Sequence, residues 1–178
     1  PGDFSSAAFL IVSCLLCKKS KITIKSVGIN FYRTGLIEIL KKMNGKVIIK
    51  NKKLLNGEEV ADLVIESSKL KGIRDNGKIS SRLIDEYPVL FVAAAFASGK
   101  TVFKKLQELK FKESNRLSSM AEALKKCGVK LKLGKDFIEI EGRDIQVGGA
   151  RIKTYGDHRI AMSMLVFGIN SEKPIILD

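Results

Sequence analysis

Three long apolar runs, each preceded by an aspartate, dominate the pattern of hydrophobic and polar positions along this chain. An aspartate before such a run predicts a helix N-terminus, because its carboxylate accepts hydrogen bonds from free amides of the first turn. A polar turn and a β-rich segment follow each run, and the strands are expected at residues 21–24, 101–103 and 174–177, the last after a turn at 170–173. The aspartates and their predicted helices are Asp3 with residues 7–17, Asp85 with residues 89–97, and Asp157 with residues 160–169.

The first two segments continue alike, with an amphipathic helix, a glycine and two further strands. Gly45 and Gly128 stand where the end of a helix favours a left-handed backbone. Together these features predict a repeated βαβαββ unit. The helices are expected at residues 34–43 and 114–127, and the strands at residues 46–50, 62–66, 129–133 and 137–141.

The repeats predict a single domain at residues 1–178, with two full units at about 1–82 and 83–150 and a partial third unit at 151–178. Since the third unit stops before its second helix, we expect the domain to be incomplete. The three apolar helices should be central because nearly all their faces are apolar. The expected fold class is α/β (α+β), with inside-out repeats in which mixed sheets flank central helices. Such a fold gathers helix N-termini at one end, where they favour anions.

Composition narrows the class of protein. The formal net charge is +13, from 32 Lys and Arg against 19 Asp and Glu. The lysines are spread out and form no basic block interleaved with aromatics. We therefore expect solvated lysine-rich faces, with recruitment of small anions as the alternative, and no nucleic-acid partner. No apolar run reaches the length of a membrane span, so no membrane partner is expected. The three cysteines suit free thiols, and the chain starts without a basic leader or Met. We expect a cytoplasmic protein and a piece of a longer chain.

The segment Lys112-Glu113-Ser114-Asn115-Arg116 is the first candidate for chemistry. Ser114 is expected to cap the helix that follows, with Arg116 in its first turn. A positive charge there is unfavourable for the helix dipole, which indicates that Arg116 serves a ligand. The alternative is a solvated, charged helix cap without function.

The segment Asp157-His158-Arg159 shows the same combination at another predicted helix start. His158 is the only histidine, and a lone histidine is more often structural than catalytic. Asp85 taken alone suits a plain helix cap. The recurrence of acids and bases at several helix starts favours a common site for two anionic substrates at one edge of the fold.

These segments resemble the 5-enolpyruvylshikimate-3-phosphate (EPSP) synthase family. The resemblance implies two similar domains of three βαβαββ units with the active site between them, of which this chain is most of the second. It also implies transfer of the enolpyruvyl group of phosphoenolpyruvate to the 5-hydroxyl of shikimate 3-phosphate, in aromatic amino-acid biosynthesis, without a cofactor or metal. The matching segments are residues 1–9, 33–35, 85–88, 112–117 and 157–162.

The resemblance implies catalytic roles for three residues. Asp85 matches the carboxylate that contacts the target hydroxyl of shikimate 3-phosphate, as the candidate base. Glu113 matches the acid/base at the phosphoenolpyruvate methylene, a role that suits a carboxylate. Lys112 matches the lysine between the two substrates.

Further residues are implied to bind substrate. Arg116 and Arg159 match the arginines that clamp phosphoenolpyruvate, with His158 beside them; a guanidinium can hold carboxylate or phosphate through two hydrogen bonds. The family usually has Asp where this chain has Asn115. Because Asn drops the charge, we expect Arg116 to be less firmly oriented.

Two other readings stay open. One is the sister enolpyruvyl transferase that acts on UDP-N-acetylglucosamine, which shares the inside-out fold. The other is a non-catalytic, basic anion-binding module. For the synthase reading, we expect this chain alone to be inactive, because the other domain is needed to close the cleft around shikimate 3-phosphate.

Overall fold

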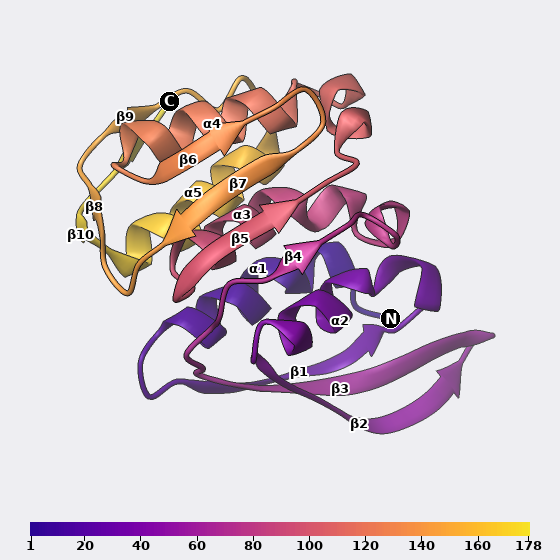
Figure 1. Cartoon of the computed structure of the whole chain (residues 1–178). Coiled ribbons are helices and arrows are strands. Elements are labelled where there is room, and N and C mark those ends of the chain that lie inside the picture. Colours follow the sequence, from indigo (N-terminus) through magenta and orange to yellow (C-terminus); the bar gives the residue numbers. More distant parts are fainter.

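The computed structural model describes residues 1–178 as helices packed against small sheets (Figure 1). The α-helices are α1 (Phe4–Leu16), α2 (Gly35–Lys42), α3 (Tyr87–Ala95), α4 (Arg116–Lys126) and α5 (His158–Asn170). The strands are β1 (Lys21–Gly28), β2 (Lys46–Leu55), β3 (Glu58–Glu66), β4 (Arg74–Asp75), β5 (Gly99–Phe103), β6 (Lys130–Leu133), β7 (Ile138–Gly142), β8 (Gln146–Gly148), β9 (Arg151–Ile152), β10 (Ser171–Lys173) and β11 (Ile176–Leu177). Short 3-10 helices are η1 (Phe31–Arg33), η2 (Ser80–Arg82), η3 (Ile84–Glu86) and η4 (Gln107–Phe111).

Two larger sheets correspond to the first two predicted repeats. The first has the order β1-β3-β2 and is antiparallel throughout. The second has the order β4-β5-β7-β6, with β4 parallel to β5 and the other pairs antiparallel. β4 lies within the range predicted for the first unit, so the second sheet begins at Arg74 rather than after residue 82. Every strand predicted in these two repeats is present.

The end of the third repeat differs in part from the prediction. Residues 170–173 were expected to form a polar turn, but Ser171–Lys173 is the strand β10, which pairs in parallel with β8. β11 lies within the strand predicted at residues 174–177 and pairs in parallel with β9. These strands are two or three residues long and join distant segments, so their own sequence carries little periodicity from which to predict them.

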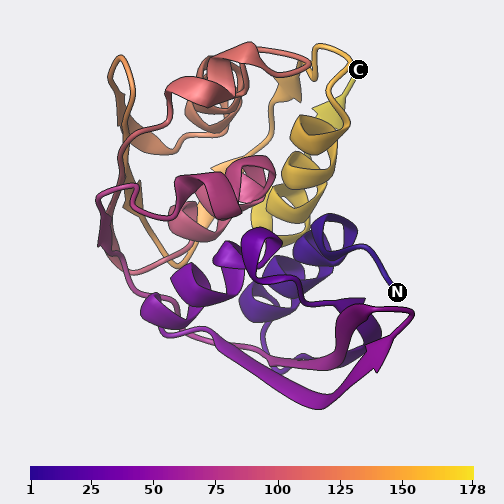
Figure 2. The ribbon, with the colours of Figure 1, turned by 90° about the vertical axis from the view of Figure 1, so that its right-hand side faces the viewer.

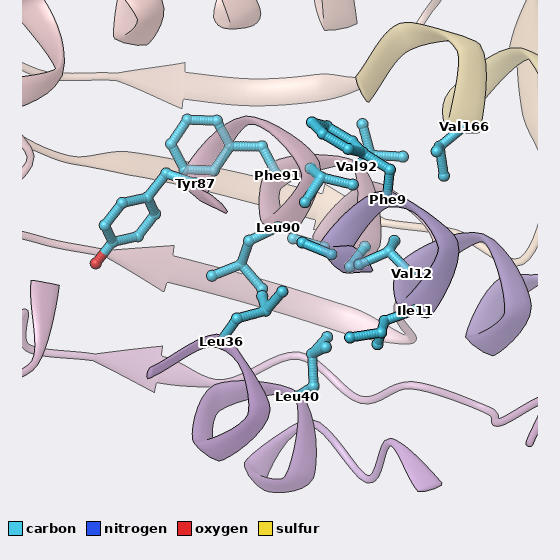
Figure 3. Close-up of a cluster of buried hydrophobic side chains, with 14 of the residues drawn as sticks. Phe9, Ile11, Val12, Leu36, Leu40, Tyr87, Leu90, Phe91, Val92 and Val166 are labelled. Atoms are coloured by element: carbon cyan, nitrogen blue, oxygen red, sulfur yellow. The ribbon is translucent and has the colours of Figure 1, made fainter. Parts of the chain in front are cut away.

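Helices α1, α3 and α5 pack against one another and form the centre of the fold. Every residue of α3 is buried, and Pro88 is tolerated in its first turn because that turn has no partner for its amide. Figure 3 shows the interior, where side chains from α1, α2, α3 and α5 meet. The prediction of central helices holds fully for α3 but only partly for α5, whose outward face carries three exposed apolar side chains, Met162, Leu165 and Ile169.

One predicted glycine role is wrong. Asn44, with a φ of +70°, takes the left-handed position after α2, whereas Gly128 takes it after α4 with a φ of +87°. Gly45 is needed for another reason: a Cβ there would lie 2.8 Å from the carbonyl oxygen of Leu40. Asparagine tolerates the left-handed region better than most residues, which explains the exchange.

The starts of α1, α3, α4 and α5 lie at the same end of the molecule, as contacts between their first residues show. This end lies on the right-hand side of Figure 1 and faces the viewer in Figure 2. The predicted gathering of helix N-termini is therefore confirmed. None of the helices has the length and apolar character required to cross a membrane.

Candidate active site

Arg116 lies at the centre of the charged cluster at this end of the fold. It begins α4, and its side chain is only 1% exposed. Its Nε donates to Asp157 Oδ2 at 2.9 Å, its Nη1 to Asp85 Oδ1 at 2.9 Å, and its Nη2 to Glu113. The buried arginine therefore joins three acids from three separate segments.

Asp157 fixes the second helix start in this cluster. Its side chain is fully buried, and it caps α5 as predicted, with Oδ1 accepting from the backbone amide of Arg159 at 2.9 Å. Its other oxygen accepts from Arg116 and from the hydroxyl of Ser114 at 3.0 Å. One carboxylate thus caps α5 and anchors the start of α4.

Two predicted caps are wrong. Asp85 does not cap α3: it lies in η3 and its side chain faces Arg116 and Lys112. Ser114 does not cap α4, because its hydroxyl is turned to Asp157, and the cap is Asn115, whose side chain accepts from the amide of Ser118. In both cases a charged partner from a distant segment takes the polar group that the local pattern assigned to the helix.

The position of Asn115 also corrects the expectation that it loosens Arg116. The Asn115 side chain accepts from the amide of Ser118 in the first turn of α4 and makes no hydrogen bond to the guanidinium. Asp157, Asp85 and Glu113 hold that group instead. The loss of charge at position 115 therefore leaves Arg116 fully oriented.

Arg159 is held much more loosely than Arg116. Its side chain is 14% exposed, and its Nη1 donates to the backbone carbonyl of Asp85 at 3.3 Å. The nearest carboxylate oxygens are on Asp85, at 3.9 Å, and Glu86, at 4.0 Å. Neither distance is that of a tight ion pair, so donors of Arg159 stay available to an anion.

The remaining predicted residues surround this cluster. Lys112 is partly exposed, and its Nζ lies 3.3 Å from Asp85 Oδ1. Glu113 is about half exposed while it contacts Arg116. His158 is exposed at the first position of α5, next to Arg159. All six predicted site residues therefore lie at one end of the fold, and five of them belong to one network of contacts.

Sequence reasoning missed a second network next to the first. The hydroxyl of Ser5 donates to Glu86 at 2.6 Å, and Arg33 donates to the same hydroxyl at 3.1 Å. Arg33 also pairs with Asp3, the cap of α1. Arg33 and Ser5 stand in segments that carry the family resemblance, but only the fold connects them to Glu86, which is 81 residues away from Ser5.

The charges of the cluster set its ionisation. Burial acts to raise the pKa of Asp85, but the three neighbouring cations outweigh it, and the pKa lies below its ordinary value. Burial opposes ionisation of Asp157 as well, yet Arg116 and the amide of Arg159 hold its pKa low. Glu86 is different, because burial dominates and raises its pKa despite the hydrogen bond from Ser5. The surroundings thus favour the carboxylate form of Asp85 and Asp157, whereas burial favours the protonated form of Glu86.

Two surface pockets lie away from these residues. One, of about 530 Å³, lies between α2 and the segment around β4. The other, of about 970 Å³, lies beside the last turn of α1 and residues 67–70. Neither pocket is lined by a residue of the charged cluster.

Comparisons with known proteins agree on one family. The family profile described as EPSP synthase (3-phosphoshikimate 1-carboxyvinyltransferase) matches residues 1–178. A 3-phosphoshikimate 1-carboxyvinyltransferase of Bartonella quintana is 49% identical over 100% of this chain and 41% of its own length. One from Thermoanaerobacter sp. is 47% identical over 97% of this chain and 40% of its own length. The chain thus spans about two fifths of the relatives it matches.

Solved structures give the same result for the fold. The EPSP synthase of Acinetobacter baumannii superposes with a TM-score of 0.95 and 40% identity, over 99% of this chain and 41% of that protein. The enolpyruvyl transferase NikO of Streptomyces tendae superposes with a TM-score of 0.72 over 97% of this chain and 38% of that protein. At 16% identity, NikO supports the fold alone. These matches confirm the predicted α/β enolpyruvyl transferase architecture, and the chain belongs to the EPSP synthase family.

Proposed function

We propose that this chain forms one wall of the active site of a 3-phosphoshikimate 1-carboxyvinyltransferase. The enzyme would transfer the enolpyruvyl group of phosphoenolpyruvate to the 5-hydroxyl of shikimate 3-phosphate and release phosphate, as a step of aromatic amino-acid biosynthesis. The observation that carries the proposal is the placement of Lys112, Arg159 and Asp85 together at the helix starts, with part of their charge turned outward. The free thiols of the chain suit a reducing, cytoplasmic location.

The reaction needs two anionic substrates held together. Arg159 and Lys112 supply positive charge, and the adjacent start of α5 contributes its dipole. A guanidinium can hold a carboxylate or a phosphate through two hydrogen bonds, whereas the lysine acts as a point charge between the substrates. Positioning two anions side by side lowers the barrier through proximity and charge compensation. His158 lies where it adds a further donor at the same helix start.

Asp85 suits the role of base toward the 5-hydroxyl. Its low pKa keeps it ionised and thus able to accept a proton, although it is a weak base while Lys112 and Arg159 face it. Substrate anions that engage these two cations would remove part of that compensation and make the carboxylate more basic. Binding of substrate and activation of Asp85 would then be coupled.

Glu113 suits proton transfer at the methylene carbon. Addition of the hydroxyl to C2 of phosphoenolpyruvate places a proton on C3, and loss of phosphate removes one from the same carbon. A single carboxylate beside C3 can do both. The Glu113 side chain is about half exposed, and its carboxylate is paired with Arg116.

The predicted contact between Arg116 and phosphoenolpyruvate stays a prediction that requires movement. With its side chain 1% exposed and three acids around it, Arg116 meets a ligand only if Glu113 or Asp85 swings away. We assign Arg116 primarily to holding these acids. The alternative activity toward UDP-N-acetylglucosamine is not favoured, because the EPSP synthase profile matches the entire chain.

The test is phosphate release from phosphoenolpyruvate and shikimate 3-phosphate. We expect none from this chain alone, because it spans about two fifths of its relatives and one wall of a cleft does not exclude water or hold shikimate 3-phosphate. Adding the remaining part of a full-length relative should restore turnover. Glu113→Gln should then lower kcat by about 10²–10⁴-fold, the usual contribution of a general acid or base.

Glu122→Gln is the matched control, because Glu122 lies on the same helix α4 and pairs only with Lys126 and Tyr155 at the surface. It should leave turnover unchanged. A folded, complemented chain without phosphate release would contradict the proposed function. Equal activity of the Glu113→Gln variant and the unaltered chain would remove the assigned role of Glu113.

A further inference from the structure

Glu86 is a buried acid at the edge of the site for which the proposed reaction has no use. The residue is 4% exposed and stands at the start of α3 without capping the helix. Burial raises the pKa of its carboxyl group above the ordinary value. A buried carboxyl group with this tendency is a site where a proton can be stored.

The partners of Glu86 leave its charge only partly compensated. The hydroxyl of Ser5 donates to it, and Arg159 approaches to 4.0 Å without closing into an ion pair. Arg33 is near, but it is already engaged by Asp3 and by the Ser5 hydroxyl. Both arginines favour the ionised form of Glu86, and Arg159 contributes more than Arg33.

The other charged groups around Glu86 strengthen this dependence. Asp85, the preceding residue in η3, adds a like charge that further raises the pKa of Glu86. Lys112 and Arg116 face Asp85. An anion bound to Arg159 neutralises the positive charge that stabilises the Glu86 carboxylate, and it adds negative charge close to that carboxylate. Protonation of the buried carboxylate then removes the repulsion.

We propose that an anion bound by Arg159 is accompanied by a proton that Glu86 takes up from solvent, so that the site binds its anion together with one proton. The inference rests on the proposed function in that Arg159 is taken as an anion-binding side chain. Only the carboxylate changes: one proton from solvent converts it to the carboxylic acid, and no other bond forms or breaks. Anion affinity should therefore fall as the pH rises through the titration of Glu86.

The experiment is a pH titration of the Glu86 side-chain carboxyl carbon by NMR, with and without sulfate. Sulfate is chosen because it stays a dianion across the titration, whereas phosphate and phosphoenolpyruvate change charge themselves; chloride at equal ionic strength controls for screening. We expect sulfate to move the midpoint upward by about one pH unit. By linkage, sulfate affinity then falls about tenfold as the pH rises through the transition.

Two variants separate the proposal from a general salt effect. Glu86→Gln imitates the protonated acid, so its sulfate affinity should not depend on pH in this range. Arg159→Gln should abolish the sulfate-induced shift of the Glu86 midpoint. Glu122→Gln should behave like the unaltered chain.

Three results would overturn the proposal: a midpoint unmoved by sulfate, a shift that survives Arg159→Gln, or a wild-type affinity as flat with pH as that of Glu86→Gln. The titration requires no turnover. A failed complementation assay would therefore contradict the proposed function and leave the titration result intact. Turnover without a sulfate-induced shift would contradict the proton uptake by Glu86 and leave the proposed function intact.

Discussion

The starts of α4 and α5 both carry an arginine, but the fold holds the two side chains in opposite ways. Arg116 is enclosed, and three carboxylates contact its guanidinium. Arg159 keeps its nearest carboxylate oxygens at 3.9 and 4.0 Å. The same residue type, in the first turn of a helix in both cases, thus serves as an internal anchor in α4 and as an open cation in α5.

The comparison shows how a charged wall is kept in order without its substrate. A surface of cations alone would repel itself and stay mobile. Arg116 binds Asp85, Glu113 and Asp157, and so fixes two candidate catalytic acids and the start of α5. This framework fixes the backbone position of Arg159, and the Arg159 guanidinium stays available to a ligand.

Replacing the anchor should have the largest effect. Arg116→Gln leaves Asp157 buried without its partner, and loss of one member of a buried ion pair costs about 3–5 kcal/mol. We expect the free energy of unfolding to fall by about 3 kcal/mol, because Asp85 and Glu113 are partly exposed and water can solvate their charges. Urea unfolding followed by circular dichroism measures it. A loss as small as that of an exposed arginine would show that Arg116 is not an anchor.

The pH dependence of the anchor can be tested through Asp157→Asn. The folded pKa of Asp157 is lowered, so its ionised form adds stability above its ordinary value of 3.8 that is lost as the pH falls below it. The variant should be less stable than the unaltered chain at neutral pH, by less than the about 3–5 kcal/mol of a fully broken buried pair because Arg116 keeps Asp85 and Glu113, and the two should converge on acidification. Unfolding curves between about pH 3 and pH 7 test this. A difference in unfolding free energy between variant and unaltered chain that stays constant with pH would show that the effect comes from packing and not from charge.

Removing the open cation should have a much smaller effect on folding. Arg159→Gln loses one hydrogen bond at 3.3 Å and two distant charge contacts. We expect the free energy of unfolding to change by less than about 1 kcal/mol, while binding of phosphoenolpyruvate is lost. Thermal unfolding and isothermal titration calorimetry on the same preparation give both values. A destabilisation equal to that of Arg116→Gln would erase the distinction between the two arginines.

The smallest effect is expected at the cap of α4. Asn115→Asp restores the family's usual residue and places a negative charge at a helix start, which should stabilise the fold by about 0.3–1 kcal/mol at low ionic strength. Because the Asn115 side chain bonds the amide of Ser118 and not the guanidinium, the hydrogen bonds of Arg116 should not change. A shift of the Arg116 side-chain NMR signals in this variant would restore the idea that position 115 orients the arginine.

The sequence predicted most of this fold because its repeats are strongly patterned. The caps at Asp3 and Asp157, the apolar helices and the strands of the two larger sheets follow from local spacing. β11 lies within the strand predicted at residues 174–177, but β8, β9 and β10 were not predicted, since each is too short to show a period. Long helices and well-paired strands carry their signal within one window of sequence, and short parallel pairs do not.

The site shows the same limit at the level of single residues. Motifs identified Asp85, Lys112, Arg116 and Arg159, and the fold brings them together. Their partners could not be predicted, because the bond between Ser5 and Glu86 spans 81 residues and the bond between Arg116 and Asp157 spans 41. Helix-cap preference assigned Asp85 and Ser114 to backbone amides, but stronger charged partners hold them in the folded chain.

The different roles of Arg116 and Arg159 are tested most directly by NMR. The side-chain Nε–H signals of both arginines are recorded while phosphoenolpyruvate is added to this chain. We predict that the Arg159 signal shifts with saturation and that the Arg116 signal stays in place, because its Nε–H is already donated to buried Asp157. A shift of Arg116 with Arg159 unaffected would contradict the account and make Arg116 the arginine that the substrate meets.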